Sequence, residues 1–310
     1  MRSIESEPRK EKLYQGIQGI EISSVGWLLQ EKELYQMVNE LNKNRSKDDQ
    51  IGIELFPHRL VTCQPKIVGL WEKENRLAKT KRIHLPVTYD SKDYSQALQG
   101  CNLKEKATSV IFLGLFGVAK NSKAIEMAKI YGLEVNLHPS SLSALFQEGK
   151  LDDLKKNTAG VFTEHTAPYN SPWVKDQRMI FDPFILKDYI KEYQIRGLTI
   201  DTDHLKKRWF GKTQGYENGF EPVKTIKENE DVTGRIHLSG QEKEHGLFPK
   251  DDPFFNSFIK EVSQMSFNQP LKIVFEFDPR ALFSWKSSKK LEFFRSLIEV
   301  IDSYRYGKKN

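Results

Sequence analysis

The feature that most constrains the fold is an alternation of short apolar segments with longer amphipathic ones. Eight apolar, β-branched segments recur along the chain, at 16–23, 51–57, 81–87, 133–139, 160–166, 198–204, 234–240 and 272–279. Helical periodicity occupies most of the intervals, as in 28–44 and 254–265. Such alternation is typical of parallel strands joined by crossover helices, and eight buried strands favour a closed barrel over an open sheet. We therefore expect an α/β protein built as a single (β/α)8 barrel.

Two connections need separate interpretation. The segment SVIFLGLFG at 109–117 would make a ninth strand, but we interpret it as the buried part of a helical stretch from about 103 to 131. Residues 205–233 form the longest connection without clear periodicity, and connections of this length are often functional. Within it, KKRWFGK at 206–212 combines cations with Trp209 and Phe210, which suits a loop that closes over a ligand.

Length and composition indicate one globular domain over residues 1–310, with a short N-terminal extension at 1–12 and a basic C-terminal tail at 305–310. The chain is 38% hydrophobic and 29% charged, and it lacks a long apolar run, so we expect no membrane partner. The first residues lack the apolar segment of a secretory signal, which predicts a cytoplasmic location. Cys63 and Cys101 are too few for a disulfide framework. A net charge of +6 suits anionic ligands but is equally what a lysine-rich surface gives.

Polar residues gather where the expected strands end. In (β/α)8 barrels the active site lies at the C-terminal ends of the strands, and five of the seven histidines fall there. Each polar residue also has a simpler explanation, as a hydrogen-bonding group or as the N-cap of the next helix, the role we expect for Asp278 and Ser140. Strand alternation turns His165 and Asp203 away from their neighbours, so we expect both outside the site.

Convergence argues against the simpler explanation for four of these residues. In a closed barrel the last four strands are neighbours, so Glu164, Asp201, His237 and Glu276 would point into one small mouth. Three buried carboxylates beside one imidazole repel one another unless a cation compensates them. We therefore predict that these four residues bind a divalent metal ion, and oxygen-rich ligation with one histidine suits Mn²⁺, Mg²⁺ or Zn²⁺.

The strand-end motifs resemble the xylose-isomerase-like TIM barrels, which include sugar and sugar-phosphate isomerases and epimerases and the endonuclease IV group. The motifs are VFTEHTA for the fifth strand, IDTDH for the sixth, RIHLSG for the seventh and IVFEFDP for the last. Each is short, but the four occur in order at suitable intervals, and the resemblance covers most of the chain.

The isomerase and epimerase branch implies one divalent ion held by Glu164, Asp201, His237 and Glu276. Glu164 and Glu276 would also be catalytic, moving protons at a sugar carbon next to a metal-bound carbonyl. In this branch His204 and Lys243 would bind the sugar or sugar-phosphate substrate.

The endonuclease IV branch implies three zinc ions and phosphodiester hydrolysis at abasic DNA. His84, His138 and Glu164 would hold the first ion. Glu164, Asp201, His237 and Glu276 would hold the second, and His204 with His245 would hold the third. The third site normally adds an aspartate two residues before its last histidine, where this chain has Lys243, with Glu242 and Glu244 as alternative carboxylates. In this branch the basic stretch at 206–212 would contact nucleic acid.

The sequence favours the isomerase branch, because the positive charge of Lys243 disfavours a third metal ion. It therefore favours a sugar or sugar-phosphate substrate over nucleic acid. No pattern fixes an oligomeric state. The positions of His84, His138 and His245 relative to the Glu164 carboxylate separate the branches: distances beyond about 8 Å rule them out as ligands of a shared cluster, since zinc–nitrogen bonds are about 2.0 Å.

Overall fold

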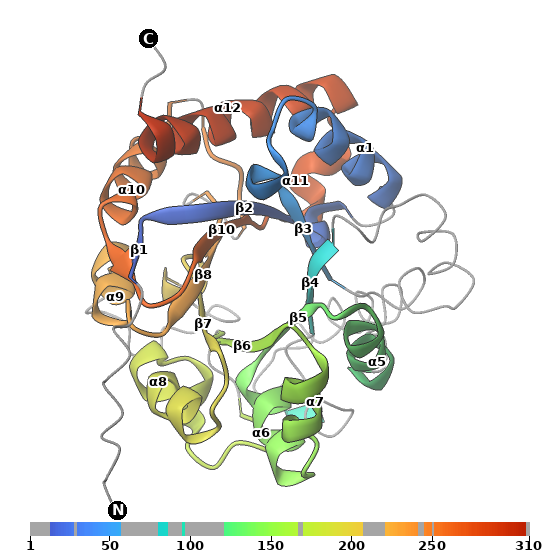
Figure 1. Ribbon diagram of the computed structural model, residues 1–310, viewed down its shortest axis with the longest axis vertical. Coiled ribbons are helices and arrows are strands. Elements are labelled where there is room, and N and C mark those ends of the chain that lie inside the picture. Colours follow the sequence, from blue (N-terminus) through green and yellow to red (C-terminus); the bar gives the residue numbers. More distant parts are fainter. Residues whose placement is uncertain are drawn as a thin grey trace, which may run out of the picture.

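Eight parallel strands close into a barrel in the computed structural model, which describes residues 13–27, 30–56, 80–85, 95–96, 121–166, 170–206, 221–240, 245–249 and 251–307. The order around the barrel is β10-β2-β3-β4-β5-β6-β7-β8 (Figure 1). Each barrel strand thus lies beside the next barrel strand in the chain, and β10 closes the barrel against β2. The strands are β2 (Ile17–Ser23), β3 (Gly52–Leu55), β4 (Thr80–His84), β5 (Glu134–Leu137), β6 (Gly160–Glu164), β7 (Gly197–Asp201), β8 (Thr233–Leu238) and β10 (Leu271–Phe275). The predicted (β/α)8 fold and its eight strands are confirmed.

Helices surround this barrel in Figure 1. The described α-helices are α1 (Glu31–Asn42), α5 (Asn121–Tyr131), α6 (Pro139–Gln147), α7 (Leu151–Asn157), α8 (Pro183–Glu192), α9 (Pro222–Glu228), α10 (Pro253–Ser263), α11 (Pro279–Phe283) and α12 (Ser287–Tyr306). Short 3-10 helices also occur in the described residues, namely η1 (Ser24–Trp27), η2 (Lys47–Asp49), η5 (Gln177–Ile180) and η6 (His204–Lys206). In the described part of the chain, no helix has the length and apolar character needed to span a bilayer.

The two connections singled out from the sequence differ in outcome. The segment 109–117 lies outside the described residues, and of the helical stretch expected at 103–131 the structure describes the last part, α5. The connection 205–233 contains a helix, α9, which begins at Pro222 with its ring at the first helical turn. The expectation of an irregular connection was therefore wrong for this part, because the helix is too short to show a periodicity. The loop residues Trp209 and Phe210 lie outside the described residues.

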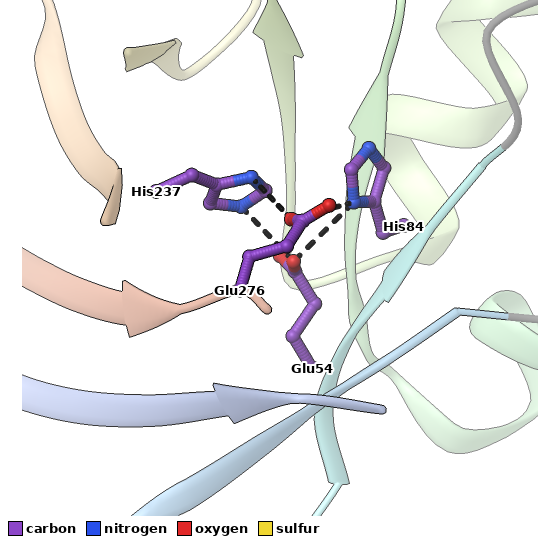
Figure 2. A group of neighbouring side chains, drawn as sticks. All are labelled: Glu54, His84, His237 and Glu276. Atoms are coloured by element: carbon purple, nitrogen blue, oxygen red, sulfur yellow. Dashed lines mark ion pairs between the residues drawn. The ribbon is translucent and has the colours of Figure 1, made fainter. Parts of the chain in front are cut away.

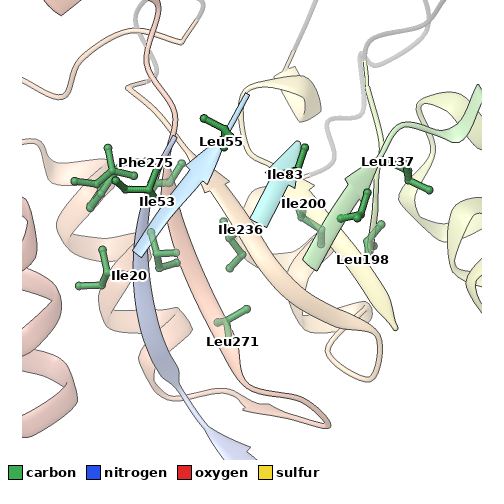
Figure 3. Packing of buried hydrophobic residues seen from close by; sticks show 14 of the residues in the cluster. Ile20, Ile53, Leu55, Ile83, Leu137, Leu198, Ile200, Ile236, Leu271 and Phe275 are labelled. Carbon is green, nitrogen blue, oxygen red and sulfur yellow. The ribbon is translucent and has the colours of Figure 1, made fainter. Parts of the chain in front are cut away.

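The outward faces of the barrel strands carry the hydrophobic core. Isoleucines and leucines stand on these faces and pack against the helices (Figure 3), among them Ile20, Ile53, Ile83, Leu198 and Ile236, all at most 3% exposed. Because side chains alternate along a strand, the residues between them point into the barrel. This alternation fixes which face each strand turns toward the interior, and thereby which residues reach the mouth.

The interior of the barrel is charged in its lower part, below the strand ends. Arg82 pairs there with Glu21 at 3.3 Å and with Glu134 at 3.8 Å, although β2, β4 and β5 are not all neighbours in the sheet. Arg235 also binds Glu134, and Lys272 binds Glu21 at 2.7 Å. Branched apolar side chains fill most such barrels, so a charged layer is a special feature of this one.

A small antiparallel sheet, which the sequence did not predict, lies at the N-terminal end of the barrel. It pairs β1 (Tyr14–Gln15) with β9 (Ser266–Phe267). Gly16 follows at a φ of +60°, and a Cβ atom there would clash with the backbone carbonyl oxygen of Ser263. Only glycine fits this turn without a clash.

Candidate metal centre

Strand register brings the four predicted ligands to one level of the barrel. Asp201 on β7 stands beside His237 on β8, and Glu164 is the last residue of β6. Glu276 directly follows β10, where its backbone N–H donates to the carbonyl of Leu238 at 3.2 Å. All four side chains are buried, with Glu276 the most exposed at 7%.

The first ligand group lies around Nδ1 of His237. This nitrogen is 3.1 Å from Oε2 of Glu164 and 2.8 Å from Oε2 of Glu276. Glu164, Asp201 and His237 each offer a ligand atom within 4.8 Å of the others. The structure thus brings three of the four predicted ligands into one group, whereas Glu276 contacts His237 and belongs to a different group. Their catalytic and metal-binding roles stay predictions.

A second group shares Glu164 with the first. Nε2 of His84 faces Nε2 of His138 at 3.0 Å and lies 3.5 Å from Oε2 of Glu164. His84, His138 and Glu164 also offer ligand atoms within 4.8 Å of one another. His84 and His138 therefore lie well within 8 Å of the Glu164 carboxylate, so both can be ligands of a shared cluster. Asn136 holds the shared carboxylate, donating to Glu164 at 2.5 Å while its own oxygen accepts from Thr199 at 2.9 Å.

The third group contains Asp201, His204 and His245, again with ligand atoms within 4.8 Å. Nδ1 of His204 is 3.3 Å from Oδ2 of Asp201 and 3.8 Å from Oε1 of Glu164. His245 adopts a left-handed backbone conformation with φ 45°, directly after residues 241–244, which lie outside the description. Lys243, the predicted substrate-binding residue, is among these.

The residues expected to point away from the site behave differently from each other. His165 accepts a hydrogen bond from the backbone N–H of Asp201 at 3.2 Å and belongs to none of the described ligand groups, as predicted. Asp203 is 7% exposed, and its Oδ2 lies 3.2 Å from the backbone nitrogen and 3.8 Å from Nε2 of His245. Asp203 also belongs to none of the described ligand groups, as predicted, but it is buried beside His245, because β7 ends at Asp201 and strand alternation no longer applies.

The helix following β5 corrects a smaller expectation. The N-cap position of α6 belongs to His138, whose side chain makes no capping hydrogen bond, and Ser140 lies inside the helix. Pro139 at the first helical position places the start of the helix there. His138 is thereby the last residue before the helix, with its ring turned to His84.

Sequence reasoning missed Glu54, the charged residue within the apolar run IGIELF. Its side chain is fully buried, and together with His84, His237 and Glu276 it forms a fourth described cluster (Figure 2). Oε1 of Glu54 is 3.0 Å from Nε2 of His237 and 3.4 Å from Nδ1 of His84. A lone glutamate at an inward position of a buried strand was the available signal.

Proximity shifts the pKa values of these groups. Burial by itself raises the pKa of Glu276, but the charges of His237 and His84 outweigh it and hold that pKa at about 2. Burial lowers the pKa of His237, yet the surrounding glutamates, Glu164 first, raise it well above 6.5. Burial and the neighbouring His84 both push the pKa of His138 well below its ordinary value. Burial raises the pKa of Glu164 against the opposing effect of His237.

The donor set fits divalent metal ions. Among the described residues, buried atoms at the mouth without a hydrogen-bond partner include Oε1 of Glu164 and Oδ2 of Asp201. Buried polar groups normally have partners, so a concentration of such atoms at one place indicates a ligand. Imidazole and carboxylate donors together suit Zn²⁺ or Mn²⁺, and Mg²⁺ where oxygen dominates.

Comparison with protein-family models and with curated proteins gives no match for this chain. The protein is a closed (β/α)8 barrel, and buried histidine–carboxylate groups that could hold metal ions lie at the C-terminal ends of its strands.

Proposed function

We propose that this protein is a metal-dependent phosphoesterase of the xylose-isomerase-like group, acting on a phosphodiester such as that of abasic DNA. The observation that carries the proposal is that His84 and His138 lie with Glu164 in a second ligand group beside the first. A mononuclear isomerase has no use for this second group. Its presence reverses the preference that the sequence alone supported.

The chain's own residues would divide the work. Glu164 belongs to both groups and would set the spacing between two ions, while Asn136 holds its Oε2. When bound, divalent ions would supply Lewis-acid stabilisation of a phosphoryl group and activation of water. The burial of the glutamates and histidines would keep competing solvent away from the reacting bond.

The third group supports a further ion despite Lys243. Asp203 places a carboxylate 3.8 Å from Nε2 of His245, and Asp201 lies with His204 and His245 in one ligand group. Asp201 thus supplies one carboxylate to this ligand group, and Asp203 places a second one beside it. The third position therefore does not depend on residue 243 for its negative charge.

The isomerase and epimerase reaction is the second candidate, because Glu164 and Glu276 both lie within 3.1 Å of the same His237 nitrogen. Two carboxylates around one metal position could take a proton from a sugar carbon and return it. This reaction needs Glu164, Asp201, His237 and Glu276, with His204 as a substrate-binding group, but neither His84 nor His138.

Substitution of His138 separates the two reactions. We expect the wild type, loaded with Zn²⁺ or Mn²⁺, to bind more than one equivalent by elemental analysis and to incise an abasic duplex. His138→Gln should lose one equivalent and most of the incision. The matched control is His165→Gln, which removes a fully buried imidazole outside every described ligand group.

A different result would support the second candidate. Binding of a single equivalent, no incision, and exchange of a ketose α-proton with deuterated water that survives His138→Gln would establish the isomerase reading and overturn the phosphoesterase.

A further inference from the structure

Glu54 occupies a position between two ligand groups without belonging to either of the two that share Glu164. Its Oε1 faces His237 at 3.0 Å and His84 at 3.4 Å, as the dashed lines of Figure 2 show. Its Oε2 faces Nη1 of Arg82 at 3.0 Å. The carboxylate is fully buried, so these contacts and not solvent determine its state.

Both histidines turn opposite nitrogens to Glu54 and to the ligand groups. His237 presents Nε2 to Glu54 and Nδ1 to Glu164 and Glu276. His84 presents Nδ1 to Glu54 at 3.4 Å, with Oε2 of Glu276 farther away at 3.9 Å, and Nε2 to His138 and Glu164. A neutral imidazole has one N–H donor and one acceptor nitrogen, and a metal needs the acceptor. A carboxylate on the far side fixes the tautomer that leaves the correct nitrogen free to bind.

Arg82 makes a ligand role for Glu54 unfavourable. The guanidinium already neutralises the carboxylate at 3.0 Å, and a metal ion at Glu54 would place a second cation beside it. The glutamate therefore has its charge compensated by the chain itself, and its remaining oxygen is directed to the two rings.

We infer that Glu54 is a positioning residue shared by two metal positions: it holds the N–H of His84 and the N–H of His237 at once, so that His84 binds through Nε2 and His237 through Nδ1. The inference rests on the proposed metal centre but not on the reaction performed there. One carboxylate would then determine which ring nitrogen of each histidine is free to bind its ion.

Glutamine cannot reproduce these contacts. If its oxygen stays toward the histidines, its amide group points at the Arg82 guanidinium, donor against donor; if it flips, the amide faces the ring N–H groups. Outer partners of ligand histidines typically change metal affinity about 10–100-fold. We therefore expect Glu54→Gln to lower the affinity for Zn²⁺ about 10–100-fold at two positions together, with stoichiometry at saturating Zn²⁺ unchanged.

The matched control is Glu21→Gln. Glu21 is equally buried and also pairs with Arg82, at 3.3 Å, but it touches neither histidine. Calorimetric Zn²⁺ titration of wild type, Glu54→Gln and Glu21→Gln should show weakened binding in Glu54→Gln alone. Equal weakening in both variants, or wild-type affinity in Glu54→Gln, would overturn the inference, since the effect would then come from buried charge in general.

Loss of one whole equivalent in Glu54→Gln, with the other affinities intact, would make Glu54 a ligand and also overturn the positioning role. A wild type that binds no Zn²⁺ would overturn the metal centre itself, whereas a wild type that binds Zn²⁺ without hydrolysing a phosphodiester would overturn only the proposed function.

Nitrogen-15 NMR of the histidine rings in the Zn²⁺-loaded wild type tests the same point without any variant, in case Glu54→Gln fails to fold. The expected result is a proton on Nε2 of His237 and on Nδ1 of His84. Protons on the opposite nitrogens would contradict the inference.

Discussion

Two levels of the same barrel carry buried charge and compensate it in different ways. In the lower layer, defined by Glu21, Arg82, Glu134, Arg235 and Lys272, every carboxylate lies against a permanent cation of the chain. At the mouth, the carboxylates lie mainly against histidines and leave atoms without hydrogen-bond partners among the described residues.

The same strands thus carry a lower layer suited to a structural role and a mouth suited to binding a ligand. Arginine cannot lose its proton in a protein, so the lower layer keeps its charge balance under all ordinary conditions. Histidine can lose its proton and expose a lone pair, so the mouth can exchange a proton for a metal ion. Glu54 joins the two levels, because it contacts Arg82 from below and two histidines from above.

The largest effect is expected at Glu164, the carboxylate common to two ligand groups. Glu164→Gln should weaken metal binding by more than about 100-fold, beyond the range typical of outer partners. Glu21→Gln, a buried carboxylate of the lower layer, should retain the metal. Equal metal content in wild type and Glu164→Gln, measured by elemental analysis after dialysis, would remove the distinction between the levels.

Breaking the lower layer should mainly cost stability. Arg82→Met leaves Glu21, Glu54 and Glu134 without their shared cation, and removal of one partner from a buried pair costs about 3–5 kcal/mol. Urea unfolding of the metal-free protein measures this loss. A change below about 1 kcal/mol would show that the lower layer tolerates uncompensated carboxylates.

The mouth should respond to pH with opposite signs in its metal-free and metal-loaded states. The raised pKa of His237 contributes stability that is fully present below 6.5 and is lost as pH rises through the higher folded-state pKa. The metal-free protein should therefore melt a few degrees lower at alkaline pH than near neutrality. The metal-loaded protein should melt higher, because its ligands must be deprotonated. Scanning calorimetry with and without a chelator checks both signs.

In the metal-free state Glu276 should be stabilising, although carboxylate crowding suggested the reverse. The attraction of His237 and His84 lowers the pKa of Glu276 to about 2, so its stabilising effect is present above 4.5 and lost as pH falls toward 2. Glu276→Gln should lower the melting temperature of metal-free protein near neutral pH. A higher melting temperature would show that repulsion among the carboxylates dominates.

The smallest effect is expected at Asp49, a half-exposed counterpart of the buried pairs. It contacts Arg305 at 2.7 Å and accepts from the Tyr306 hydroxyl at 2.7 Å. Burial raises its pKa, but Tyr306 and Arg305 together lower it, so its contribution is lost as pH falls. Asp49→Asn should cost about 0.5–1 kcal/mol at neutral pH, since solvent screens such pairs. A loss as large as that of Arg82→Met would mean that burial does not set the strength of these pairs.

Much of the site could be predicted from the sequence, because the hydrophobic pattern locates the strands and the site residues lie where the strands end. A strand end in a parallel barrel faces one mouth, so His84, His138, Glu164, Asp201, His204, His237 and Glu276 could be named before any contact was known. Glu54 and Asn136 lie within the strands and not at their ends, so a search of strand ends missed both, and the only signal for Glu54 was a lone glutamate in an apolar run. Asp203 stays outside the described ligand groups, as predicted, but its burial beside His245 was not foreseen, because alternation does not extend past the end of its strand.

The sequence by itself determined the barrel and the residues gathered at its mouth, because hydrophobic period and strand-end position are local properties of the chain. Tertiary structure decided how those residues are shared: that Glu164 serves two groups, that Asp203 approaches His245, and that Glu54 lies between His84 and His237. Such contacts join strands far apart in sequence, and their distances depend on barrel closure and register, which no local pattern encodes.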